Sequence, residues 1–119
     1  MKSEATLKPE EFCLVFVTCE SEEQAVKMAE ALVGDGLAGC VSVLKDVFSV
    51  YRWMGKVEKA EETLLMIKTR ISLFPEVERM VKRLHTYTTP EIVGFKFDKA
   101  FPAYLQWLKE ETALKPSGK

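Results

Sequence analysis

The 119-residue sequence predicts a single α+β domain with the element order strand, helix, strand, strand, helix, strand, and then a third helix. Apolar runs typical of strands alternate with segments that repeat apolar residues at helical spacing. Two of the strands are separated only by a short turn, which indicates a hairpin. We therefore treat residues 1–119 as one domain and expect residues 1–11 and 115–119 to be flexible tails.

The first strand and helix are predicted from residues 12 to 33. Phe12 to Thr18 is apolar on both alternating faces, which is typical of a central strand that is covered on both sides. Ser21 is followed three residues later by Gln24, as in a capping box, and apolar residues then recur at helical spacing until Gly34. This pattern predicts a helix over Glu22 to Val33.

A long β-hairpin is predicted next. Cys40 to Trp53 is rich in Val, Tyr, Phe and Ser, Met54-Gly55-Lys56 forms a turn, and a second β-type run ends at Leu64 to Ile67. The base of the hairpin is apolar, whereas its far half carries charged side chains, namely Arg52, Lys56, Glu58, Lys59, Glu61 and Glu62. We expect this charged tip to project from the body of the protein.

The remaining elements are a helix, a strand and a helix. The second helix opens near Ser72 and Pro75 and ends around His85, with an apolar face formed by Val77, Met80, Val81 and Leu84. A short strand follows over Ile92 to Phe97. Pro102 starts the third helix, whose expected apolar stripe consists of Phe101, Tyr104, Leu105 and Leu108.

This order of elements is that of the ferredoxin-like fold, in which the first and third strands are central. Two helices cover only one face of a four-stranded sheet, so the other apolar face of the first strand would meet water. We therefore expect the chain to form a homo-oligomer that covers this face.

Composition excludes several function classes. Seventeen Lys and Arg balance eighteen Asp and Glu, so no basic field exists to attract nucleic acid, and no apolar run is long enough for a membrane span. An RNA-recognition module shares the topology but displays aromatic residues on its third strand, and Thr63 to Ile67 contains none. The three cysteines form no C-x-x-C pair, and the N-terminus has no secretory h-region, so we expect a cytoplasmic protein.

Enzymatic motifs are also lacking from the sequence. There is no G-x-S-x-G elbow and no phosphate-binding glycine loop, and His85 is the only histidine, so two imidazoles cannot act within one subunit. We expect a protein that is not an enzyme.

His85 and Cys40 are the candidate metal ligands. His85 follows a helix, where it could be either a ligand or a structural cap, and imidazole is a preferred ligand of copper and zinc. Cys40 lies among strand valines and could be either a core thiol or a ligand for a soft ion. No E-x-x-H or H-x-x-x-H spacing completes a metal site within one chain, although three subunits could assemble one.

A second candidate site combines aromatic and polar side chains. Tyr51 and Trp53 alternate along one face of a strand, which is common in interface packing, but the nearby polar residues exceed what packing requires. The predicted site is a cleft between subunits that takes a small anionic or metal-bound ligand and is formed by Tyr51, Trp53, Glu58, Lys68, His85, Tyr87 and Glu91.

Three segments together resemble the CutA divalent-cation tolerance family: LAGCVSVL at Leu37 to Leu44, SVYRWMGKVEKAEETLLMIKT at Ser49 to Thr69, and LHTYTTPEIVGF at Leu84 to Phe95. The resemblance implies a ferredoxin-like homotrimer similar to the PII signalling proteins. It also implies a role in tolerance to copper and other divalent ions, with no cofactor required. The alternative function is that of a PII-like sensor or scaffold with small-molecule clefts and a protein partner that remains to be identified.

Overall fold

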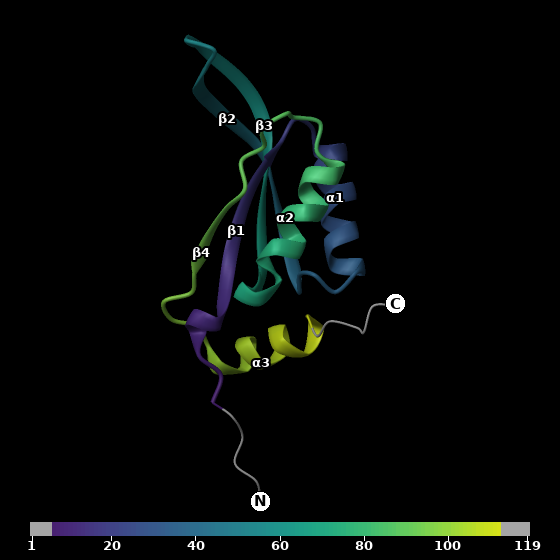
Figure 1. Cartoon of the computed structure of the whole chain (residues 1–119), viewed down its shortest axis with the longest axis vertical. Coiled ribbons are helices and arrows are strands. Elements are labelled where there is room, and N and C mark those ends of the chain that lie inside the picture. Colours follow the sequence, from purple (N-terminus) through teal and green to yellow (C-terminus); the bar gives the residue numbers. More distant parts are fainter. Residues whose placement is uncertain (1–5, 113–119) are drawn as a thin grey trace, which may run out of the picture.

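The computed structural model describes residues 6–112 and confirms the predicted order of elements (Figure 1). The strands are β1 (Phe12–Cys19), β2 (Cys40–Trp53), β3 (Lys56–Arg70) and β4 (Val93–Lys96). The helices are α1 (Glu22–Gly34), α2 (Phe74–Leu84) and α3 (Pro102–Glu111), with short 3-10 helices at Pro9–Glu11 and Ile71–Leu73. Of the expected tails, residues 1–5 and 115–119 lie outside the described residues.

The four strands form one antiparallel sheet in the order β2-β3-β1-β4, so β1 and β3 are central, as predicted. β3 continues to Arg70, three residues beyond the predicted end at Ile67, because its last residues pair with Phe12, Cys13 and Leu14 of β1. Their polar side chains hid this extension from the apolar pattern. No helix within residues 6–112 has the length and hydropathy needed to cross a membrane.

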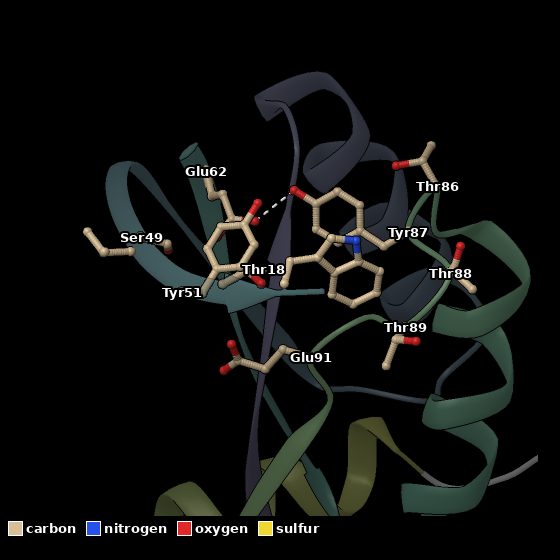
Figure 2. Close-up of a pocket in the computed structure, with 11 residues that line it drawn as sticks. Thr18, Ser49, Tyr51, Glu62, Thr86, Tyr87, Thr88, Thr89 and Glu91 are labelled. Carbon is tan, nitrogen blue, oxygen red and sulfur yellow. Dashed lines mark hydrogen bonds between the residues drawn. The ribbon is translucent and has the colours of Figure 1, made fainter. Parts of the chain in front are cut away.

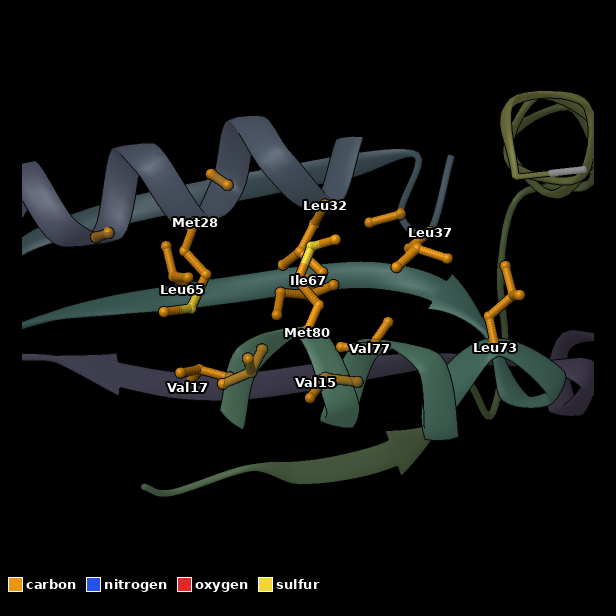
Figure 3. Close-up of a cluster of buried hydrophobic side chains, with 14 of the residues drawn as sticks. Val15, Val17, Met28, Leu32, Leu37, Leu65, Ile67, Leu73, Val77 and Met80 are labelled. Carbon is orange, nitrogen blue, oxygen red and sulfur yellow. The ribbon is translucent and has the colours of Figure 1, made fainter. Parts of the chain in front are cut away.

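Helices α1 and α2 cover one face of the sheet and enclose the main core (Figure 3). Met28 and Leu32 of α1 meet Leu65 and Ile67 of β3, and α2 adds Val77. The predicted cap starts α1, because the Ser21 hydroxyl accepts a hydrogen bond from the Gln24 amide at 3.1 Å.

The apolar stripes of α2 and α3 are narrower than predicted. Leu84 is 40% exposed, because it lies at the last turn of α2 beyond the edge of the core, and Phe101 is 74% exposed, because it precedes α3 as its N-cap. Leu105 and Leu108 instead pack with Phe12 in a second cluster. Helix α3 therefore lies across the end of the sheet where β1 begins (Figure 1).

The hairpin of β2 and β3 projects beyond the rest of the chain, as predicted (Figure 1). It contributes to an elongated shape with principal extents of 61 × 33 × 22 Å. Its tip is a two-residue loop between the paired residues Trp53 and Lys56. Met54 and Gly55 both have positive φ, at 52° and 81°, which matches the strand twist of a tight hairpin.

A β-bulge interrupts β2 where the hairpin leaves the body. Leu44 pairs with Leu64 and Val47 pairs with Glu62, so β2 advances three residues while β3 advances two. Asp46 within the bulge has a φ of 64°, a left-handed conformation that Asp tolerates better than most residues. After the bulge, the odd-numbered residues of β2 share the face of Glu62, whereas before it the even-numbered residues occupy that face.

We call the sheet face opposite α1 and α2 the outer face. Leu14 and Phe16 of β1 lie there half-buried, and Phe16 packs edge-on against Phe95 with ring centroids 5.6 Å apart. Phe95 is 53% exposed, and Val93 and Leu44 are also exposed. Much of the outer face is uncovered within residues 6–112, since helix α3 lies across only one end of the sheet. The sequence predicted this uncovered apolar face and, from it, a homo-oligomer.

The conformation of Asp46 gives a stability test. We expect Asp46→Gly to unfold at the same or a higher denaturant concentration, because Gly adopts positive φ freely. Asp46→Val should be less stable than Asp46→Gly by about 1–2 kcal/mol, since a β-branched residue is strained in this conformation. Urea unfolding measures both variants, and equal stability of the Val and Gly variants would contradict the bulge.

Two buried thiols make stability dependent on pH. Burial raises the pKa of Cys13 from 9.0 to about 11, and burial together with the nearby Glu62 charge does the same for Cys19. The unfolded chain releases these protons first, so stability is full below pH 9 and is lost as the pH rises toward 11. Between pH 8 and 10 we expect a loss of about 1 kcal/mol per thiol. The double variant Cys13→Ala/Cys19→Ala should lose this pH dependence of the free energy of unfolding, measured by urea unfolding under reducing conditions. An unchanged pH dependence would contradict its assignment to the two thiols.

Candidate ligand-binding cleft

A cleft of about 690 Å³ opens where the hairpin leaves the sheet (Figure 2). One wall comes from the sheet and consists of the outer-face residues Thr18, Ser49, Tyr51, Trp53 and Glu62, together with Val50, whose position in the strand alternation is the opposite one. The other wall is the loop between α2 and β4, which contributes Thr86, Tyr87, Thr88, Thr89 and Glu91. This volume is in the range of small-molecule sites.

His85 fixes the loop wall to the sheet. It ends α2, with its backbone amide donating to the Val81 carbonyl at 2.8 Å. Its Nδ1 accepts a hydrogen bond from the Tyr87 amide at 3.0 Å, so the ring proton is on Nε2, which donates to the Thr18 carbonyl at 2.7 Å. Both ring nitrogens of the neutral imidazole are therefore occupied by backbone groups.

Tyr87 connects the two walls. Its hydroxyl donates a hydrogen bond of 2.7 Å to Oε2 of Glu62, drawn as the dashed line in Figure 2. Burial raises the pKa of Tyr87 well above its ordinary value, and the hydrogen bond to Glu62 adds to this effect. Tyr87 thus remains a neutral donor, and it supports a Glu62 carboxylate that is only 8% exposed.

The cleft is acidic. Glu62 and Glu91 are its two charged side chains, and no Lys or Arg is among the residues that line it in the described part of the chain. Thr and Ser hydroxyls supply further oxygen atoms. Carboxylate and hydroxyl oxygens suit cations, whereas an anion would need a positive group that these walls do not contain.

The structure brings together four of the residues predicted for this site: Tyr51, Trp53, Tyr87 and Glu91. His85 lies directly behind the loop wall. Glu58 pairs with Tyr51 in the hairpin register but is exposed and does not line the cleft.

Lys68 and Cys40 lie together elsewhere on the sheet. Lys68 pairs with Cys40 across β2 and β3, with its Nζ 3.6 Å from the Cys40 sulfur and hydrogen-bonded to the Ser42 hydroxyl. His85 contacts Thr18, which pairs with Leu64 of β3. Leu64 lies four residues along β3 from Lys68, the partner of Cys40, which is a distance of roughly 13 Å. His85 and Cys40 are therefore far apart, and within residues 6–112 no three His, Cys, Asp or Glu side chains form a ready metal site.

Sequence reasoning missed Glu62 as a site residue because it was grouped with the charged residues of the hairpin tip. It also missed the hydroxyl residues of the cleft, namely Thr18, Ser49, Thr86, Thr88 and Thr89. The turn-rich segment from Thr86 to Pro90 was the available signal for a loop wall, but nothing in it indicated which strand the loop would face.

Fold and cleft together define a ferredoxin-like α+β protein with an acidic, aromatic cleft at the base of a long hairpin. The model of the CutA1 divalent ion tolerance protein family matches residues 13–111, nearly all of the described chain. The chain belongs to the CutA1 divalent ion tolerance protein family.

Individual relatives agree with this assignment. The divalent-cation tolerance protein CutA of Thermus thermophilus is 43% identical over 99 residues, which cover 83% of this chain and 96% of the relative. Protein CutA of Mus musculus is 38% identical over 97 residues, which are 82% of this chain but only 55% of the mouse protein.

Solved structures match the fold as well. The Thermus thermophilus Cut A1 structure gives a TM-score of 0.84 at 42% identity, covering 86% of this chain and 99% of the other. The Archaeoglobus fulgidus CutA structure, described as periplasmic, gives 0.83 at 33% identity, covering 86% and 99%. Relatives thus include a protein assigned to a compartment other than the cytoplasm, and a cytoplasmic location for this chain stays a prediction.

The Tyr87 hydrogen bond can be tested by removing one oxygen atom. Tyr87→Phe leaves the buried Glu62 carboxylate without its donor, so we expect a loss of about 1–3 kcal/mol in the free energy of unfolding. Tyr51→Phe is the matched control, because its ring lines the same cleft without a side-chain hydrogen bond among the described residues. Equal effects of the two variants in urea unfolding would contradict the role assigned to Tyr87.

Proposed function

We propose that the chain is a non-enzymatic homotrimer that binds divalent cations, with copper among them, and that no further cofactor is required. The observation that carries this proposal is the acidic cleft, in which Glu62 and Glu91 occur with no basic side chain among the described lining residues. The family's association with divalent-ion tolerance and the names of the relatives agree with it.

Glu62 and Glu91 are the proposed primary ligands. Oxygen donors bind divalent ions without the need to remove a proton near neutral pH. His85 is the proposed third ligand, and it would free Nδ1 by giving up the hydrogen bond from the Tyr87 amide. Cys40 offers a separate, soft site suited to Cu(I), since it is a free, half-buried cysteine whose sulfur accepts a hydrogen bond from Lys68.

The homotrimer is supported by the outer face. Phe95 and Val93 on β4 and Leu44 on β2 are exposed apolar side chains at the two edges of this face, and a second copy of the chain would bury them. A trimer would present three symmetry-related copies of the cleft and of its carboxylates. The free thiols Cys13, Cys19 and Cys40 fit the reducing compartment proposed for the protein.

The second candidate function is that of a PII-like sensor or scaffold. The cleft volume favours it, because about 690 Å³ accommodates a small organic molecule and far exceeds one ion. If the ligand is anionic, as the sequence suggested, its positive partner would have to come from a neighbouring subunit.

Native mass spectrometry after incubation with Cu²⁺ or Zn²⁺ tests metal binding. We expect one ion per subunit in the parent protein and a loss of roughly tenfold or more in affinity for Glu62→Gln, which keeps the size of the side chain. Glu61→Gln removes the same charge from an exposed position outside the cleft and is the control. Equal binding by both variants would refute the cleft as the metal site.

Two further variants separate the ligand routes. His85→Ala should weaken copper binding, and binding by the parent should weaken as the pH falls, because protons compete with the metal for a nitrogen ligand. If Cys40→Ser alone abolishes binding, the thiol is the site and the cleft is not. If neither variant matters, the sensor function takes first place.

The trimer has its own test. Light scattering at micromolar concentration should return a particle three times the 13.5 kDa chain mass. Phe95→Glu should dissociate it, because a charge on this exposed apolar face would be buried without a partner, whereas Phe95→Leu should preserve it. A parent protein that remains at the mass of one chain would contradict the assembly.

A further inference from the structure

The aromatic side chains of the cleft have no role in binding a bare metal ion. Tyr51 and Trp53 come from β2, and Tyr87 comes from the opposite wall. Figure 2 shows Tyr51 on the β2 side and Tyr87 on the loop side of the cleft, with the dashed hydrogen bond from Tyr87 ending on the Glu62 carboxylate. A divalent ion keeps tightly held water or oxygen ligands around it and gains little from ring faces.

These rings are not packed against one another. Tyr51 and Trp53 are 43% and 48% exposed, respectively. The ring that packs against Tyr87 is that of His85, tilted by 46° with centroids 4.7 Å apart, and no ring pair among the described residues joins Tyr51, Trp53 and Tyr87. The ring faces of Tyr51 and Trp53 are thus available to a ligand within the cleft.

Glu62 is a buried carboxylate with unused capacity for hydrogen bonds and ion pairs. Its side chain is more than nine-tenths buried, yet across residues 6–112 no Lys, Arg or His pairs with it. Its Oε2 accepts from Tyr87, and no donor in the same residues reaches Oε1. A buried charge of this kind is costly unless it meets a positive partner, so the cleft is suited to a ligand that carries one.

We propose that the cleft binds an organic ammonium group, of the size and chemistry of a choline head group or a methylated amine. The group would place its positive charge beside Glu62 and its methyl or methylene surface against Tyr51, Trp53 and Tyr87. Ring faces attract cations, and an alkylated ammonium loses water more easily than a metal ion does. Glu91 at the rim adds a second negative charge.

This inference rests on the proposed function only because both use the same acidic cleft. It names organic ammonium compounds as the ligand class of the PII-like sensor, the second candidate function. The probe is choline, and the matched control is 3,3-dimethylbutan-1-ol, which has the same shape without the charge. Saturation-transfer NMR on the full chain should show choline binding roughly tenfold or more tightly than the neutral isostere. Equal binding of the two, or no binding of choline to the assembled protein, would overturn the proposal.

Variants assign the site within the chain. Trp53→Leu should weaken choline binding roughly tenfold, and Trp53→Phe, which keeps a ring, should lose less. Trp107→Leu is the control, since this second tryptophan lies on α3 outside the cleft. Glu62→Gln should also reduce choline binding, with Glu61→Gln as its control. Unchanged choline affinity in both Trp53→Leu and Glu62→Gln would overturn the proposal.

The same variants distinguish this proposal from metal binding. Trp53→Leu leaves both carboxylates in place, so its affinity for choline should fall by a larger factor than its affinity for Cu²⁺. A parent that binds copper through Glu62 but prefers choline no more than its isostere would overturn the ammonium site alone. A parent that prefers choline but binds no copper would overturn the metal proposal alone.

Discussion

One extra residue in β2 determines the character of the cleft. The bulge between Leu44 and Val47 shifts the alternation of the strand, so that Tyr51 and Trp53 point to the outer face with Glu62. With uninterrupted pairing, these two aromatics would share the face of Val43, on the side of α1, and the outer face would receive their neighbours instead. The left-handed conformation of Asp46 is the local cost of this arrangement.

The opposite wall depends on a chain of hydrogen bonds from helix to sheet. His85 holds the loop after α2 to the Thr18 carbonyl near the end of β1, and Tyr87 then reaches across to Glu62 on β3. These contacts place a buried carboxylate, a neutral phenol and two exposed aromatic rings around one cavity. Because no basic side chain enters it within the described residues, the cleft attracts positive charge, whether this is a divalent ion or an organic ammonium.

Much of the fold could be predicted from the sequence, since apolar runs such as Phe12 to Thr18 and the cap at Ser21 are local signals that tertiary packing reinforced. The site was only partly predictable. Tyr51, Trp53, Tyr87 and Glu91 were found as polar and aromatic residues near a turn-rich segment. Glu62 was missed because the burial of a charged residue depends on register and on Tyr87, which are long-range features. Lys68 was included because one-dimensional spacing could not separate the two ends of the sheet.

The placement of Tyr51 on the outer face can be measured directly in solution. Nuclear Overhauser effects between the Tyr51 ring and the side chains of Thr18 and Tyr87 would report which face of β2 forms the cleft. We expect contacts from the Tyr51 ring to both walls and none from the Val43 methyl groups, which pack toward the helices. Contacts from the Phe48 ring in place of the Tyr51 ring would show that β2 lacks this bulge and would contradict the proposed cleft.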